Sequence, residues 1–136
     1  MNDPILTQIK EHLEFLGFQT EVSPDDAERQ WVKARHPTRP NMYIGRLKSG
    51  VLFSAPYSTT DAAKGQRAEL LEFVNGFNTL SAVCRAYVDK DSDVAVEAWF
   101  PGVYLRPELS VFLDLVSDDV MKGFNANRDL TRKLLK

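Results

Sequence analysis

The spacing of apolar residues changes along the chain and predicts both helices and strands. Asp3 and Pro4 suit the cap and first turn of a helix, and Gly17 suits its end. Between them the apolar residues recur at intervals of three and four, at Leu6, Ile9, Leu13 and Leu16. Residues 18–22 then predict a short first strand.

The middle of the chain has the period of two that is typical of strands. The predicted strands are residues 31–35, MYIGRL at 42–47 and VLFSAPY at 51–57. The dipeptide at 49–50, Ser-Gly, suits a two-residue turn between the last two of these. Such a turn would place Leu47 opposite Leu52 and Arg46 opposite Phe53.

The helical period returns from residue 61 and predicts one long helix to about Asn78. A further helix begins at Pro107, with an apolar stripe at Leu109, Phe112, Leu113, Val116 and Val120. Residues 123–136 suit an extra C-terminal helix. The order α-β-β-β(-β)-α-β-β-α predicts an α+β fold, with helices packed on an antiparallel sheet. A length of 136 residues predicts a single domain over 1–136.

Residues 82–100 predict an antiparallel hairpin with the tip DKDSD. If Val88 pairs with Val94, strand geometry separates the two faces of this hairpin. One face is small and apolar and suits the packing of a helix: Cys84, Ala86 and Val88 opposite Ala98, Val96 and Val94. The other face carries Val83, Arg85 and Tyr87 opposite Trp99, Glu97 and Ala95, with Arg85 and Glu97 as a cross-strand ion pair.

This mixed face of the hairpin has two interpretations. When helices cover only one side of a sheet, aromatic residues on the other side are either covered within the fold or serve as a binding surface. In the first interpretation the mixed face is a partner or dimer surface formed by Val83, Arg85, Tyr87, Glu97 and Trp99. In the alternative interpretation Tyr87 and Trp99 lie over neighbouring strands under a loop, and the sequence leaves both open.

Three aspartates at the hairpin tip have part of the spacing of a calcium loop. Asp89, Asp91 and Asp93 match the first three ligand positions of such a loop. Val94 stands where that loop needs Gly, and Phe100 stands where it needs a bidentate Glu. We therefore expect a solvated tip and assign no metal.

No set of residues has the spacing of a catalytic or cofactor site. His12 and His36 fall in unrelated segments, and neither has a nearby nucleophile or ligand at a fixed spacing. The single cysteine, Cys84, points to the apolar side of its predicted strand, where a thiol is inert. Glycine-rich phosphate loops and the GxSxG motif are absent from the sequence. We expect a protein that is not an enzyme and has no cofactor.

Charge and targeting signals narrow the possible partners. A formal charge of -2 gives no overall attraction to nucleic acid or to anionic lipid. A locally basic stretch with aromatic residues, Trp31, Lys33, Arg35, Arg46 and Lys48, is the alternative patch for single-stranded nucleic acid. The N-terminal residues resemble neither a secretory leader nor a membrane span, and one cysteine suits a reducing compartment. We expect a cytoplasmic protein.

Three segments together resemble the YbjN family of candidate bacterial sensory-transduction regulators. They are FVNGFN at 73–78, CRAYVDKDSDVAVEAWFPGV at 84–103, and the helix from Pro107. The matching positions are Asn75, Asn78, Arg85, Asp93 and Glu97, while Ser92 stands where the family usually has Gly. For Asn75 and Asn78 a structural role near the helix end is expected.

The resemblance implies a fold like that of the type III secretion chaperones, an α/β sandwich with helices on a curved antiparallel sheet. It also implies a homodimer without enzyme activity that binds a protein or peptide. The sequence therefore predicts a cytoplasmic regulator or chaperone-like protein that presents a sheet face or groove to its partner. The alternative is a nucleic-acid-binding module that uses the basic strands 31–48.

Overall fold

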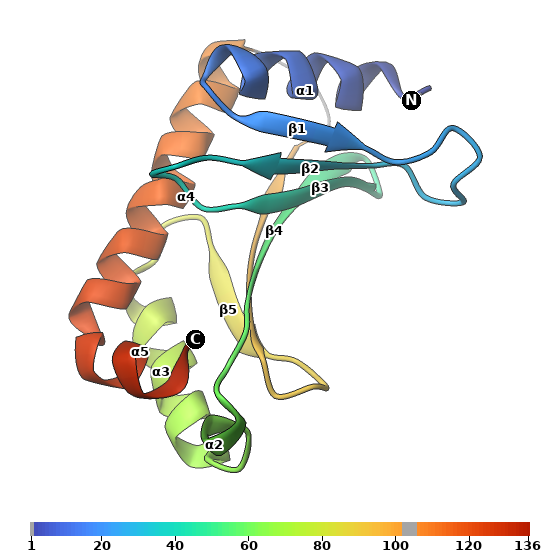
Figure 1. Cartoon of the computed structure of the whole chain (residues 1–136). Helices are drawn as coiled ribbons and strands as arrows, with labels where there is room; N and C mark the ends of the chain where they lie inside the picture. The colour runs from blue at the N-terminus through green and yellow to red at the C-terminus, as the bar shows by residue number, and fades with distance from the viewer. Residues whose placement is uncertain (1, 102–105) are drawn as a thin grey trace.

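The computed structural model describes residues 2–101 and 106–136, in which helices cover one face of a six-stranded antiparallel sheet (Figure 1). The elements in chain order are α1 (Pro4–Phe15), β1 (Gln19–Val22), β2 (Trp31–Arg35), β3 (Met42–Leu47), β4 (Gly50–Tyr57), α2 (Asp61–Lys64), α3 (Arg67–Leu80), β5 (Arg85–Val88), β6 (Val94–Phe100), α4 (Arg106–Ala126) and α5 (Arg128–Leu134). The predicted α+β fold is confirmed.

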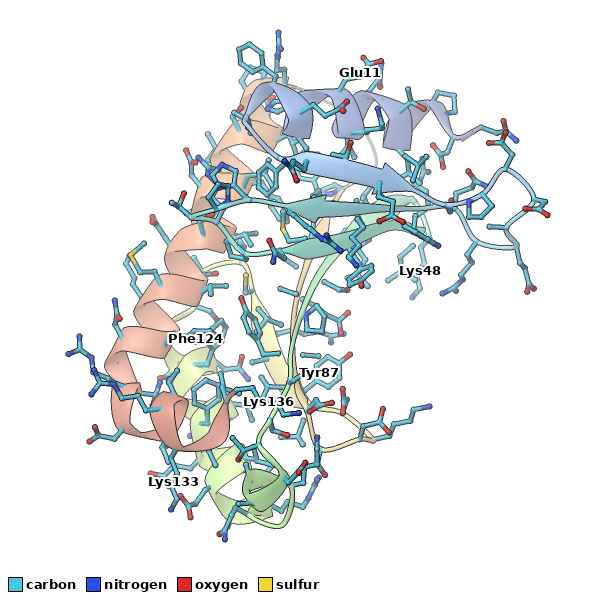
Figure 2. The ribbon with its side chains drawn as sticks, viewed as in Figure 1. Glu11, Lys48, Tyr87, Phe124, Lys133 and Lys136 are labelled. Carbon is cyan, nitrogen blue, oxygen red and sulfur yellow. The ribbon has the colours of Figure 1, made fainter. Side chains whose placement is uncertain are left out.

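The strand order in the sheet is β1-β2-β3-β4-β6-β5. The first four strands form a meander, and β6 then lies between β4 and β5. Alternate residues of every strand face the helices, and the others face away from them. We call the helix-free side the outer face, and Figure 2 shows Tyr87 projecting on it while Phe124 lies on the helix side.

The first helix forms as its sequence predicts. The carboxylate of Asp3 accepts hydrogen bonds from the backbone N–H groups of Ile5 and Leu6 at 2.9 and 3.2 Å. Gly17 follows the helix with a φ of 95°, which glycine adopts without steric cost. The helix buries Leu6, Ile9, His12 and Leu13 against the sheet.

One predicted helix is two helices in the structure. The chain leaves the helical path after Lys64, and Gly65 and Gln66 separate α2 from α3. Thr60 caps α2 by accepting a hydrogen bond from the backbone N–H of Ala63 at 3.1 Å. The prediction of one helix from residue 61 was wrong, because α2 is a separate helix with its own cap. The residues of α2 nevertheless fit the helical period, which is why the sequence did not separate the two helices.

The turn between β3 and β4 lies one residue earlier than predicted. Leu47 pairs with Gly50 and Arg46 pairs with Val51, so Lys48 and Ser49 form the turn. Lys48 takes the positive φ of 56° that the prediction assigned to a glycine. Gly50 is instead a strand residue, and its lack of a side chain makes room for Trp99.

The core is continuous between the sheet and the helices. Its largest side chains include Phe53 from β4 and Phe73 and Phe77 from α3, all at most 2% exposed. The predicted stripe of α4 is buried as well, since Leu109 and Leu113 are 0% and 2% exposed. No helix of the described residues is both long and apolar enough to cross a membrane.

The α3 and α4 helices fasten the edge strand β5. The Asn78 amide on α3 donates to the backbone oxygen of Ala86 at 3.0 Å and accepts from its N–H at 2.8 Å. The Asp119 carboxylate on α4 accepts the N–H groups of Ala82, Val83 and Cys84 at 2.8 to 2.9 Å. These two hydrogen bonds confirm the predicted structural role of Asn78, whereas the role of Asn75 stays a prediction.

The tip of the β5–β6 hairpin is tied to the rest of the protein. Asp93 accepts hydrogen bonds from Lys64 Nζ at 2.7 Å and from the Thr59 backbone N–H at 2.9 Å. Ser92 has a positive φ of 62°, which explains why glycine is suited to that position. The prediction of a freely solvated tip is therefore wrong for Asp93.

Candidate partner-binding face

The outer face carries two rows of side chains that cross the sheet at right angles to its strands. The first row is apolar and joins four strands through the opposed pairs Trp31 to Gly45, Gly45 to Leu52, and Leu52 to Trp99. The second row is polar and runs Glu21, Lys33, Tyr43, Ser54, Glu97 and Arg85. Directly opposed residues of antiparallel strands touch on the same face, so each row forms one continuous surface.

The aromatic residues of the outer face remain accessible. Tyr43, Tyr87 and Trp99 are 43%, 42% and 45% exposed, and Leu47 is 36% exposed. No described element packs over them, because the helices gather on the other side of the sheet (Figure 1). Of the two interpretations of Tyr87 and Trp99, the geometry matches the open face.

Glu97 lies between Ser54 and Arg85 in the polar row and is only 8% exposed. The predicted pairing with Arg85 is present in the strand register, and the Arg85 Nη2 to Glu97 Oε1 distance is 3.9 Å. A hydrogen bond to Glu97 raises the pKa of Tyr87, and partial burial adds to that effect. Arg85 lies over the Tyr87 ring, with its guanidinium carbon 5.9 Å from the ring centre.

Trp99 is fixed in place although its ring is half exposed. Its indole Nε1 donates to the backbone oxygen of Leu47 at 3.2 Å. Its ring fills the space that a Cβ atom at Gly50 would occupy. A rigid, exposed indole loses little side-chain entropy on binding, which is a property of residues that contribute strongly to interfaces.

The surface predicted from the hairpin is mostly assembled, with one exception. Arg85, Tyr87, Glu97 and Trp99 share the outer face. Val83 precedes β5 and packs against the hydrophobic core, so it is not part of this face. The strand begins three residues later than expected, at Arg85, because the Asp119 carboxylate accepts hydrogen bonds from the backbone N–H groups of residues 82–84.

The predicted basic patch is divided between different parts of the sheet. Trp31, Lys33 and Arg35 lie on the outer face, where Lys33 Nζ is 5.3 Å from the centre of the Tyr43 ring. Arg46 lies on the same side of the sheet as Ile44, toward the helices. Its Nη1 is 3.5 Å from Oδ1 of Asp3. Lys48 lies in the turn. The five residues therefore do not form one patch, because Arg46 alternates to the helix side.

A hollow of about 430 Å³ lies at the end of the apolar row, where β3 continues beyond the start of β2. Gly45 leaves its floor without a side chain. Its outer-face walls are Trp31, Tyr43, Leu47, Leu52 and Ser54, and Asp3, Arg46 and residues 28–30 close its end. The sequence analysis missed this hollow, although a glycine inside a predicted strand is a known signal for close approach.

The histidines and the cysteine have structural contacts. His12 Nε2 lies 3.0 Å from Ser110 Oγ, and burial, followed by the charge of Arg106, lowers the pKa of His12. His36 Nδ1 accepts the backbone N–H of Thr38 at 3.1 Å. Burial, and then the nearby Asp119 carboxylate, raise the pKa of Cys84 to about 12. These shifts keep the Cys84 thiol protonated and unreactive at neutral pH.

The described residues contain no group of three or more His, Cys, Asp or Glu side chains arranged to hold a metal ion. At the hairpin tip the Asp89 carboxylate accepts the backbone N–H groups of Asp91 and Asp93 at 2.9 and 3.0 Å. The Asp93 carboxylate is occupied by Lys64 and Thr59. The spacing of the three aspartates thus supports a turn.

Comparisons with known proteins identify the fold. The crystal structure of YbjN from E. coli, described there as a candidate transcription regulator, matches with a TM-score of 0.67 and 16% identity, over 96% of this chain and 95% of that one. The chain has a YbjN-like fold. An uncharacterized protein from Methanothermobacter thermautotrophicus shares this YbjN-like fold, with a TM-score of 0.63 and 15% identity over 90% of this chain and 96% of that chain. No family model and no curated protein matches the sequence.

The YbjN-like fold agrees with the predicted arrangement of helices packed on an antiparallel sheet. Identities of 15% and 16% establish the fold alone. Neither description names an enzyme. The last two residues of the resembling segment at 84–103 lie outside the described part of the chain.

Proposed function

We propose that this protein is a non-enzymatic cytoplasmic regulator or chaperone-like protein that binds a protein or peptide on its outer face. The observation that carries the proposal is the exposure of three aromatic side chains, Tyr43, Tyr87 and Trp99, on a sheet face without helices. Large exposed aromatic patches are unusual on soluble monomers and are typical of interaction sites. The YbjN-like fold, found in a candidate regulator, is consistent with this role.

A second copy of the chain is one form that the partner can take. The outer face has oppositely charged residues opposed at both ends of its polar row, Glu21 to Lys33 and Glu97 to Arg85. A row that carries both signs of charge leaves the aromatic residues to supply most of the binding energy. A homodimer would therefore bury Tyr43, Tyr87 and Trp99 at its centre.

Photo-crosslinking in the native cell tests the proposal. A photoreactive amino acid replaces Tyr87 on the outer face or, as a matched control, Met121 on α4, which is 60% exposed. We expect a discrete crosslinked product from position 87 and not from position 121, identified by mass spectrometry as another protein or a second copy. Equal products from both positions, or none from position 87, would contradict the proposal.

Nucleic acid is the competing partner, and retention on single-stranded DNA tests it. Only Trp31, Lys33 and Arg35 of the basic stretch share the outer face, so few phosphate contacts are possible. We expect no retention on single-stranded DNA at physiological salt. Retention that falls steeply as salt rises, and is lost with Lys33→Ala, would favour the nucleic-acid function instead.

A further inference from the structure

The polar row of the outer face changes the sign of every charge when it is read in the opposite direction. Its members, from one edge of the sheet to the other, are Glu21, Lys33, Tyr43, Ser54, Glu97 and Arg85. The first two positions are negative and positive, the middle two are uncharged, and the last two are again negative and positive. The row is therefore complementary in charge to a reversed copy of itself.

A two-fold axis produces this reversal when it runs parallel to the strands, midway between β3 and β4. Three strands of the sheet then lie on each side of the axis. Two outer faces related by it meet with β1 opposite β5, β2 opposite β6, and β3 opposite β4. Glu21 faces Arg85 of the second copy, and Lys33 faces Glu97 of the second copy. An axis along the row would instead oppose every charged residue to itself, and like charges repel.

The apolar row of the outer face is compatible with the same axis. Its members, in the same direction, are Trp31, Gly45, Leu52 and Trp99. The axis places Trp31 opposite Trp99 of the second copy, and Gly45 opposite Leu52 of the second copy. A Cβ atom at Gly45 would meet only the Gln30 backbone oxygen, at 3.7 Å, so the space above this glycine can take a leucine side chain.

The charges of the polar row are weakly paired within the chain. The Arg85 side chain is 75% exposed, and its contact with Glu97 is long, at 3.9 Å. Glu21 is exposed and has no ion pair within the part of the chain that the structure describes. Lys33 Nζ lies over the Tyr43 ring rather than against a carboxylate. A second copy can therefore bring opposite charges to groups that the chain leaves exposed.

The twist of the sheet permits this contact between two outer faces. Strands β1 to β3 run across the view of Figure 1, whereas β4 and β5 run down it. Such a sheet is saddle-shaped, and a two-fold rotation about an axis along its central strands gives the same saddle again. Twisted sheets that pack face to face accordingly keep their strand directions within about 30° of each other.

We propose that the outer face binds a second copy of this chain, about a two-fold axis that lies between β3 and β4. This arrangement rests on the partner-binding function proposed for the outer face, and it makes the partner a second copy. The exposed aromatic residues Tyr43 and Trp99 are buried in the dimer. The two kinds of charged contact, Glu21 to Arg85 and Lys33 to Glu97, fix the orientation of the copies.

Charge reversal at Glu21 and Arg85 tests the arrangement. These residues lie on opposite edge strands, five strand spacings or about 24 Å apart along the sheet, so they cannot touch within one chain. We expect the parent protein to sediment as a dimer, at twice the 15.4 kDa of one chain. Glu21→Arg and Arg85→Glu each oppose like charges and should raise the dimer Kd about tenfold. Glu72→Arg, at an exposed position on α3, is the control and should leave the Kd unchanged.

Mixing the two variants separates a contact between copies from a simple loss of stability. In a mixed dimer the new arginine of one copy faces the new glutamate of the other, and the two unchanged residues also have opposite charges. We expect mixed dimers to form in preference to either homodimer, measured by capture on an affinity tag carried by one variant. Single variants that dimerise as the parent protein does, or no preference for the mixed dimer, would overturn the proposal.

A photoreactive amino acid at position 87 gives a test that needs neither variant. In the proposed dimer Tyr87 faces Gln19 of the second copy, whereas in one chain these residues lie on opposite edge strands. Irradiation of the purified protein should link position 87 to a peptide that contains β1. A link only to other parts of the second copy would overturn the arrangement.

Failure of this proposal differs from failure of the function on which it rests. If the parent protein is monomeric, and position 87 captures a different protein in the cell, the second copy is not the partner but the outer face still binds one. If position 87 captures nothing in the cell, the function itself fails.

Discussion

The indole ring of Trp99 lies directly against Gly50, so these two residues share one position on the outer face. Gly50 is at once a strand residue and the base on which the ring rests. The indole N–H reaches past it to the Leu47 backbone oxygen at 3.2 Å. The exposed aromatic surface of β6 is thus held by a residue of β4.

Gly50→Ala should destabilise the fold and displace Trp99, because the new methyl group would overlap the indole ring. Overpacking of this kind costs about 1–3 kcal/mol. Gly45→Ala is the matched control, since its methyl group has room and should be neutral or stabilising by up to about 1 kcal/mol. Urea unfolding measures both variants, and equal effects of the same sign would contradict the assignment.

Asp119→Asn should weaken the attachment of residues 82–84, which link α3 to β5, to helix α4. The carboxylate accepts three backbone N–H groups, from Ala82, Val83 and Cys84, and an amide would turn its own N–H₂ toward some of them. Unsatisfied donors cost about 1–3 kcal/mol each, so we expect a loss of about 2–3 kcal/mol. Hydrogen exchange of these three amides should accelerate.

Asp118→Asn is the control for this change, because Asp118 is exposed beside Asp119 on the same helix. Its effect should stay within about 0.5 kcal/mol. Unchanged protection of the Cys84 amide in Asp119→Asn would show that the carboxylate is not the clamp.

Asn78→Ala should loosen the edge of β5. The variant loses both hydrogen bonds to the Ala86 backbone, and we expect a loss of about 1–2 kcal/mol. Hydrogen exchange at the Ala86 amide should be faster. Asn75→Ala, at an exposed position one turn earlier, should change neither quantity.

The Asp93 contacts should make stability depend on pH in acid. Hydrogen bonds from Lys64, and then from the Thr59 backbone, lower the pKa of Asp93 to about 2. The pKa of an ordinary aspartate is about 3.9. A folded-state pKa below the unfolded one contributes stability above pH 4, and that contribution is lost as the pH falls from about 4 to 2.

Urea unfolding at a series of pH values compares Asp93→Asn with the parent protein. We expect the difference in unfolding free energy between them to shrink over that acid range. Asp91→Asn, whose side chain is exposed at the same tip, should follow the parent protein at every pH. A constant difference for Asp93→Asn would argue against the ionised contact.

Features set by neighbours in the sequence were predictable. The cap at Asp3, and the pairing of Val88 with Val94 and of Arg85 with Glu97, depend on local geometry and alternation. The turn at residues 48–49 was missed because the glycine beside it serves Trp99, which is distant in the sequence. Tertiary contacts of that kind leave no periodic signal.

The missed site residues have weaker signals that are visible in retrospect. Asp119 occupies the buried stripe of α4 between Val116 and Val120, where a carboxylate needs a partner. Gly45 lies inside a strand and starts no turn. The sharing of one sheet face by Tyr43, Tyr87 and Trp99 depends on the strand order, in which β6 pairs with β4. No local sequence pattern contains that order.

The insertion of β6 between β4 and β5 has a consequence for folding kinetics. The meander from β1 to β4 can form from neighbouring segments, whereas the pairing of Val51 with Phe100 must close a long loop. Until β6 and α4 arrive, Phe53 lacks Phe112, whose ring lies 5.2 Å away, centre to centre. A growing chain therefore exposes the middle of its sheet until late in synthesis. The chain is most prone to aggregate during this period of exposure.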